Sequence, residues 1–146
     1  MLSEFARVDA GEKFAAIFDK YFAPIRGPVM ITGANVIRYA ARIAVAKAHW
    51  ADRIAAEVLK VERAGYQTLE CRNIAIGHAI LAFGEIFELL QDPEPVLRFV
   101  RKQLKNSRPS TRKKAEQFLK RAEKAARVSG CKECCCAALA TGNGRK

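Results

Sequence analysis

Apolar residues recur every three to four positions through most of the chain, and the alternating pattern of a strand is almost absent. Such spacing predicts amphipathic helices, because it gathers the apolar side chains on one face of a 3.6-residue period. No internal repeat is visible in the sequence. The pattern therefore predicts an all-α protein, a helical bundle of about five helices.

Prolines, glycines and capping residues divide this pattern into segments. The predicted helices span residues 3–22, 35–64, 68–91, 94–106 and 110–128. The second contains neither proline nor glycine, so we expect one unbroken helix of about eight turns. Thr32 or Asn35 would cap it, after an extended connector over residues 29–31. Ser129 and Gly130 would end the fifth helix.

The segment 68–91 is apolar on most of its faces, which predicts a central place in the core. Thr68 is its predicted N-cap, and Glu70 would lie in the first turn. Gly77 and Gly84 are seven residues apart and share one face of the helix. Since neither has a side chain, another helix is expected to approach closely there.

The charge divides the chain more sharply than the apolar pattern does. The 146 residues include 26 Lys and Arg against 15 Asp and Glu, a net charge of +11. Residues 1–92 hold 11 basic and 11 acidic residues, whereas residues 93–146 hold 15 and 4. We therefore expect a neutral helical core over 1–92 and a basic helical hairpin over 93–130, packed on the core or extending from it. A flexible, cysteine-rich tail would follow over 131–146.

Both helices of the predicted hairpin separate apolar from cationic side chains on opposite faces. Val96, Val100 and Leu104 line the apolar side of one helix, and Phe118 and Ala122 that of the other. From residue 98 to residue 127 there are 12 basic and only 2 acidic residues. The basic residues are Arg98, Arg101, Lys102, Lys105, Arg108, Arg112, Lys113, Lys114, Lys120, Arg121, Lys124 and Arg127.

These cationic faces favour contact with the phosphate backbone of DNA or RNA, with little dependence on base sequence. The linker from Ser107 to Thr111 adds hydroxyl groups and helix N-terminal amides that bind phosphate. Because its turn carries proline where glycine is usual, a helix-turn-helix is the less favoured form. The protein would serve as an accessory subunit among the proteins of a nucleoprotein complex, and a homo-oligomer is compatible with this prediction.

Two other interpretations of the charge remain open. The basic hairpin could dock on an acidic surface of a partner protein, as an inhibitor would. It could also be no more than a solvated charged face.

Four of the five cysteines crowd into six residues near the end of the chain, at Cys131, Cys134, Cys135 and Cys136. A C-x-x-C pair gives two thiolates to a zinc ion, but a closed site needs four ligands. Cys71, His49, His78 or a second chain would have to complete it. Without a second C-x-x-C motif no cofactor is predicted, and zinc is the weaker alternative beside reactive free thiols.

Catalytic motifs are missing from the sequence: there is no P-loop, nucleophile elbow or dinucleotide fingerprint, so no enzyme is predicted. The N-terminus does not resemble a signal peptide. The most apolar stretch, residues 74–90, is interrupted by charge and short for a membrane span, so no membrane partner is expected. The clustered cysteines indicate a reducing compartment, and we expect a cytoplasmic protein.

Overall fold

The computed structural model describes residues 13–137, with side chains described for residues 13–125. This part of the chain is helical and has no strands, which confirms the all-α prediction. Its helices are α2 (Lys13–Phe22), α3 (Met30–Ala46), α4 (Ala51–Leu59), α5 (Leu69–Ile86), α6 (Glu94–Gln103) and α7 (Pro109–Ala137). Short 3₁₀ segments lie at Ala23–Arg26, Ala48–Trp50, Lys60–Arg63 and Phe87–Leu89.

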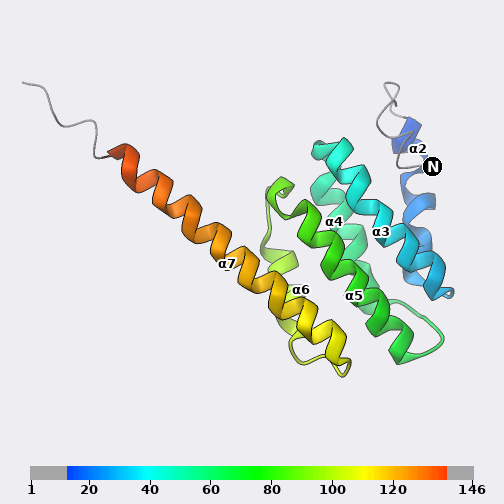
Figure 1. Ribbon diagram of the computed structural model, residues 1–146. Helices are drawn as coiled ribbons and strands as arrows, with labels where there is room; N and C mark the ends of the chain where they lie inside the picture. Colours follow the sequence, from blue (N-terminus) through cyan, green and yellow to red (C-terminus); the bar gives the residue numbers. More distant parts are fainter. Residues whose placement is uncertain (1–12, 138–146) are drawn as a thin grey trace, which may run out of the picture.

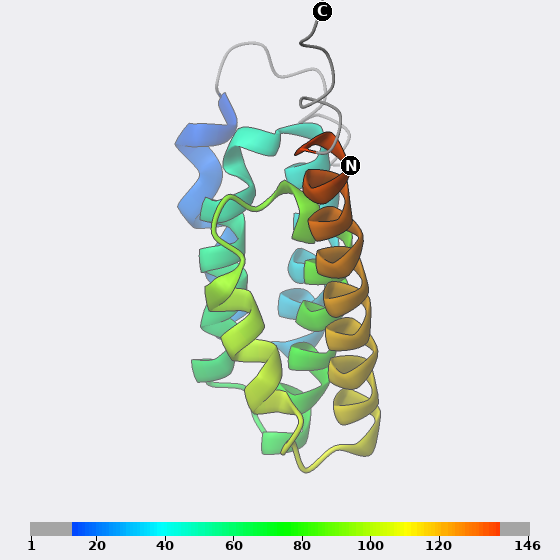
Figure 2. The ribbon, with the colours of Figure 1, turned by 90° about the vertical axis from the view of Figure 1, so that its left-hand side faces the viewer.

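The helices form two layers (Figures 1 and 2). In the first layer α3, α5 and α7 lie side by side and run in the same direction, and α5 contacts both neighbours. In the second layer α2, α4 and α6 run the opposite way. The described chain is therefore a stack of three helical hairpins, α2–α3, α4–α5 and α6–α7, each packed against the next.

The single long helix predicted over residues 35–64 is wrong. The chain leaves helical geometry at Lys47, with φ −132° and ψ 75°, and reverses into α4. After α4, the Gly65 amide donates to the Arg26 carbonyl over 2.8 Å, so the chain has returned to a point beside the start of α3. An unbroken helix would extend about 45 Å. Folded back on each other, α3 and α4 instead bury Ile37 and Ile54 in one core. This burial stabilises the reversal more than helix propensity stabilises one straight helix.

The start of α3 also differs from the prediction. The helix begins at Met30, with Val29 as its extended N-cap, so Thr32 and Asn35 are not caps and residues 30–31 are not a connector. Gly27 makes the preceding turn with a φ of 110°, in the region that favours glycine. A β-carbon there would lie 3.0 Å from the Gly65 backbone, so the turn needs glycine for space as well.

The central position predicted for the third helix is confirmed, since α5 buries Ala79, Ile80 and Phe83 between its neighbours. Thr68 is its N-cap, and its hydroxyl accepts from the Cys71 amide over 3.1 Å. Gly77 and Gly84 both face α7, and the predicted close approach is confirmed at Gly77, where a β-carbon would lie 3.3 Å from Thr111 and Lys114, whereas at Gly84 it would make an ordinary contact at 3.9 Å. The helix ends at Ile86, before the Gln91 expected from the apolar pattern.

The last two helices form an antiparallel hairpin, which differs from the steep crossing of a helix-turn-helix (Figure 2). The helix α6 begins at Glu94, as predicted, and ends at Gln103. The helix α7 continues to Ala137, so the stop predicted at Ser129 and Gly130 is wrong. One glycine inside a helix costs only about 1 kcal/mol. The far part of α7 projects beyond the other helices (Figure 1).

Candidate nucleic-acid interface

The apolar and cationic faces predicted for α6 are present in the structure. Val96, Phe99 and Val100 are buried, and the Phe99 ring meets that of Phe83 edge-on at 5.7 Å. Gln103 takes the remaining buried position, whereas Leu104 is 39% exposed. The basic side chains are all exposed: Arg98, Arg101, Lys102 and Lys105.

The helix α7 is sorted in the same way. Ala115 and Phe118 are buried against α5 and α6. Lys113, Lys120, Arg121 and Lys124 are exposed, whereas Arg112 and Lys114 are half-buried. The side chain of Arg127 lies outside the described residues.

The basic side chains divide over three surfaces and do not form one stripe. Lys102 reaches Glu62, so this side of α6 belongs to the second layer. Arg121 borders a groove with Val45 of α3 and Glu85 of α5, on the solvent side of the first layer. Lys113, Lys120 and Lys124 lie about 140–180° around α7 from buried Ala115, at the free end of the stack.

Carboxylates from outside the stretch of residues 98–127 neutralise some of these cations. Arg101 pairs with Glu94 at 3.3 Å and Lys102 with Glu62 at 3.2 Å. Arg108 pairs with Glu70 at the start of α5. Counting charges along one stretch of sequence missed these partners, because Glu62 and Glu70 lie about 40 residues away.

The remaining exposed cations of the hairpin form no ion pair with any residue that the structure describes. They are Arg98, Lys105, Lys113, Lys120, Arg121 and Lys124. They are the basic side chains of α6 and α7 most available to an external anion.

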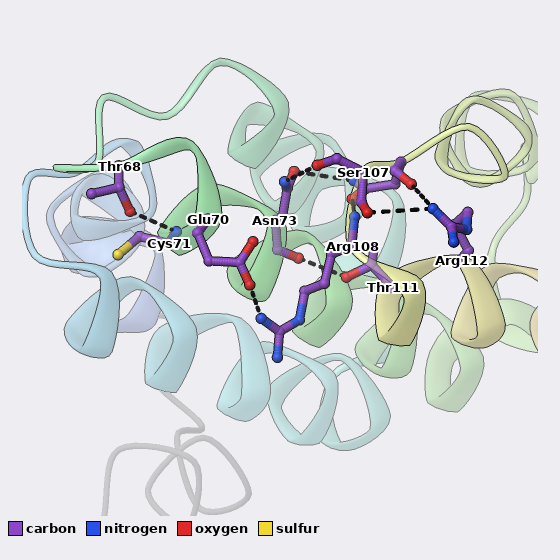
Figure 3. A network of polar contacts seen from close by, with 9 residues as sticks. Thr68, Glu70, Cys71, Asn73, Ser107, Arg108, Thr111 and Arg112 are labelled. Atoms are coloured by element: carbon purple, nitrogen blue, oxygen red, sulfur yellow. Dashed lines mark hydrogen bonds and ion pairs between the residues drawn. The ribbon is translucent and has the colours of Figure 1, made fainter.

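The loop between α6 and α7 is tied to α5 (Figure 3). The Asn73 side-chain amide donates to the Ser107 hydroxyl over 2.9 Å, and the Thr111 hydroxyl donates to the Asn73 carbonyl over 2.9 Å. Asn106 donates to the side-chain oxygen of Asn73 over 3.1 Å. The hydroxyls predicted to bind phosphate thus dock the hairpin on the core. Asn73 was missed by the sequence analysis, although a lone amide inside an apolar helix marks such a contact.

The two arginines nearest this loop are also engaged. Arg108 forms the ion pair with Glu70, and its own amide donates to the Asn106 side chain over 2.9 Å. Arg112 donates to the carbonyl oxygens of Asn106, over 2.8 Å, and Ser107, over 3.3 Å. Both side chains therefore help to shape the loop.

Lys114 is directed differently from the other cations of α7. A β-carbon on Gly77 would lie 3.3 Å from the Lys114 Nζ, so the amine lies across α5, next to His78. Burial, together with the charge of Arg108, lowers the pKa of Lys114. Burial lowers the pKa of His78 too, and the charges of Lys114 and Arg38 lower it further.

The cysteine cluster lies far from two of its proposed ligands. Thr111 contacts Asn73, and Cys131 follows 20 residues later on α7, about 30 Å along the helix axis. Cys71 lies two residues before Asn73, at the opposite end of this axial distance from the Cys131 backbone. His78 lies beside Lys114, about 25 Å from the cluster by the same measure.

Zinc binding remains a prediction, because the side chains of Cys131, Cys134, Cys135 and Cys136 lie outside the described residues. Within the described part, no three or more His, Cys, Asp or Glu side chains are arranged to hold a metal ion.

No family model, curated protein or solved structure matches the chain. Among the helices described, none has both the length and the hydropathy required to span a membrane.

Proposed function

We propose that the protein binds the phosphate backbone of DNA or RNA, with little sequence specificity, through the exposed cations of α7. The main support is a row of three exposed side chains without ion pairs in the described structure: Lys113, Lys120 and Lys124. This α7 row spans 12 residues, about 16 Å of helix axis. Duplex DNA presents about ten phosphate charges over that length.

The side chains around the α7 row favour backbone contact over base stacking. Phe99 and Phe118 are buried, so α6 and the described part of α7 expose no aromatic ring on which an unpaired base could stack. The α7 row also presents long cationic side chains that reach phosphates without entering a groove. A duplex, or a structured RNA, is therefore the expected ligand, bound as one component of a nucleoprotein complex.

A salt series with mixed-sequence duplex and single-stranded DNA and RNA tests this proposal. Three neutralised phosphates predict a log–log slope of affinity against salt of about −2.7. The double substitution Lys120→Glu with Lys124→Glu should reduce the slope by about 2 and weaken duplex binding at least tenfold. Circular dichroism should show unchanged helical content, because both side chains are exposed.

The matched control is Lys20→Glu with Arg63→Glu, which lowers the net charge from +11 to +7, as the first pair does. These residues are exposed and lie outside the α6–α7 hairpin, on α2 and on the 3₁₀ turn after α4. The slope should be preserved in this variant. A flat salt response of the unchanged protein, or an equal loss in both variants, would contradict binding by the α7 row.

A groove beside α7 favours a second candidate function, the docking of a protein partner. It lies between α6 and α7 and is lined by Leu97, Leu119 and Ala122, with Arg101 and Glu123 among its borders. Such a groove suits an apolar segment of a partner protein. Leu97→Asp should leave nucleic-acid binding intact if the α7 row acts alone, whereas a loss would implicate the groove.

A further inference from the structure

Three basic side chains, one from each helix of the first layer, come close together on its exposed face. They are Arg38 on α3, His78 on α5 and Lys114 on α7, and the three parallel helices lie side by side (Figure 1). Each of the three stands seven residues, about two turns, before a residue of the groove shared by Val45, Glu85 and Arg121, which sets them at one level of the same face. None of the three side chains makes a hydrogen bond or ion pair within the described structure. Basic side chains that lie together without a carboxylate partner attract an anion.

The shape of α5 holds the lysine in this position. Because Gly77 has no side chain, the Lys114 stem lies across the helix, with its Cδ 3.6 Å and its Nζ 3.3 Å from where a β-carbon would be. His78 is the next residue along α5, and both basic side chains are half-buried. The Lys114 amine is therefore directed towards α5 and the His78 imidazole, away from the α7 row.

The basic groups near His78 come from both neighbouring helices. Burial lowers the pKa of the imidazole, and the charges of Lys114 on α7 and Arg38 on α3 lower it further. Of the carboxylates on α5, Glu70 is paired with Arg108. Glu85 lies two turns beyond His78, in the groove that Arg121 borders. An anion bound between the three basic groups would relieve their mutual repulsion.

We propose that Arg38, His78 and Lys114 form a binding site for a phosphate group. A guanidinium binds two phosphate oxygens at once, an ammonium adds a compact charge, and a protonated imidazole donates a further hydrogen bond. Together the three groups can bind several oxygens of one phosphate, whether that phosphate is terminal or part of a backbone. The phosphate site is distinct from the α7 row and does not depend on the function proposed for it.

Nuclear magnetic resonance of the two histidine rings tests the phosphate site with inorganic phosphate as the probe. The His78 ring is titrated with pH in phosphate and in chloride at equal ionic strength, and His49, between α3 and α4, is the internal reference. Bound phosphate should raise the pKa of His78 by about one unit, because a nearby anion stabilises the imidazolium. The same His78 titration in both salts would overturn the proposal.

Two substitutions separate a specific site from a general salt effect. Lys114→Met keeps the stem over Gly77 but removes the charge, and Arg38→Gln removes the guanidinium from an exposed position. Each variant should begin with a higher pKa for His78, because one repelling charge is gone, and should lose the further rise in phosphate. A rise that persists in both variants would overturn the site.

Oligonucleotides show whether the phosphate is terminal or part of a backbone. If it is terminal, a 5′-phosphorylated strand binds more tightly than the same strand with a 5′-hydroxyl, and Lys114→Met abolishes the difference. If it belongs to the backbone, both strands bind equally and Lys114→Met weakens both. Strands unaffected by Lys114→Met, together with an unchanged His78 titration, would refute the phosphate site.

The same measurements distinguish failure of this site from failure of the α7 row. A His78 response to phosphate that survives Lys120→Glu with Lys124→Glu supports the phosphate site, even if duplex binding is lost. Duplex binding that is intact while His78 ignores phosphate overturns this site alone.

Discussion

At the scale of single residues, Gly33 and Tyr66 fix the start of α3. The Tyr66 hydroxyl donates to the Ile25 carbonyl over 2.7 Å and occupies the space where a β-carbon of residue 33 would lie. The same β-carbon would be 2.9 Å from the Pro24 carbonyl oxygen. The glycine is thus required by a backbone contact as well as by a side chain.

Gly33→Ala should therefore destabilise the protein by about 1–3 kcal/mol, because strain and a lost buried hydrogen bond outweigh the better helix propensity of alanine. Gly84→Ala is the matched control. Its β-carbon would lie an ordinary 3.9 Å from the Phe118 ring, so this variant should be neutral or gain up to about 1 kcal/mol. Urea denaturation measures both, and equal shifts in the two variants would contradict the assigned contacts.

His78 gives a second prediction at this scale. Its pKa is lowered in the folded protein by burial, Lys114 and Arg38, so the unfolded chain binds more protons as the pH falls. In a chloride buffer, the contribution of His78 to stability should be constant above about pH 6.5 and should decrease on acidification below it.

Replacing the titrating ring should flatten this dependence. In His78→Gln the decrease in the urea midpoint between pH 7 and pH 5 should be smaller than in the unchanged protein. His49→Gln should keep the dependence of the unchanged protein, because only the His78 ring has these two basic neighbours. A dependence that His78→Gln leaves unaltered would assign the acid sensitivity to other groups.

At the scale of elements, Asn73 joins α5 to the α6–α7 hairpin. The residue is only 5% exposed and makes both of its side-chain hydrogen bonds with the loop that precedes α7. Asn73→Ala should cost about 2 kcal/mol, from two lost hydrogen bonds. The loss should be local, since the rest of α5 packs through apolar side chains.

Amide hydrogen exchange checks this expectation. Residues 112–118 of α7 should exchange faster in Asn73→Ala, whereas the central turns of α3 should be little changed. Cys71→Ala, two residues earlier on the same helix, is the control and should leave α7 protected. Faster exchange throughout both helices would mean that Asn73 supports the whole core.

The elements also show what local sequence determines. Thr68, the glycine pair of α5 and the breaks before α6 and α7 were predicted because caps, missing side chains and prolines act within a few residues. The reversal at Lys47 has no such local cause and follows from burial on both sides. The separation of apolar and cationic faces on α6 and α7 was predicted from the helical period. The carboxylates Glu62 and Glu70, which pair with Lys102 and Arg108, lie on distant elements and were not predicted.

At the scale of the whole molecule, the stack of hairpins separates the cations that sequence order brings together. Arg98 lies about 160° around α6 from buried Val96 and Val100, on the outside of the second layer, and Lys105 follows in the turn after α6. The α7 row lies at the end of the stack. A straight duplex placed along α7 would therefore contact the α7 row more closely than it contacts Arg98 and Lys105.

The charge reversals Arg98→Glu with Lys105→Glu should then weaken duplex binding less than Lys120→Glu with Lys124→Glu, by less than tenfold against tenfold or more. Both pairs change the net charge by four, so a difference between them reports position and not total charge. Equal losses would show that the nucleic acid wraps around both surfaces.

The length of α7 has a mechanical consequence. The helix is fixed to α5 near Asn73 and continues for 29 residues, about 43 Å, with its far part beyond the stack (Figure 1). It packs on α5 and α6 as far as Ala122, and only the part beyond these contacts is a free arm. A tilt of about 10° at Ala122 would displace Ala137 by about 4 Å. A ligand that alters the contacts around Ala122 would therefore produce its largest displacement at the far end of the helix.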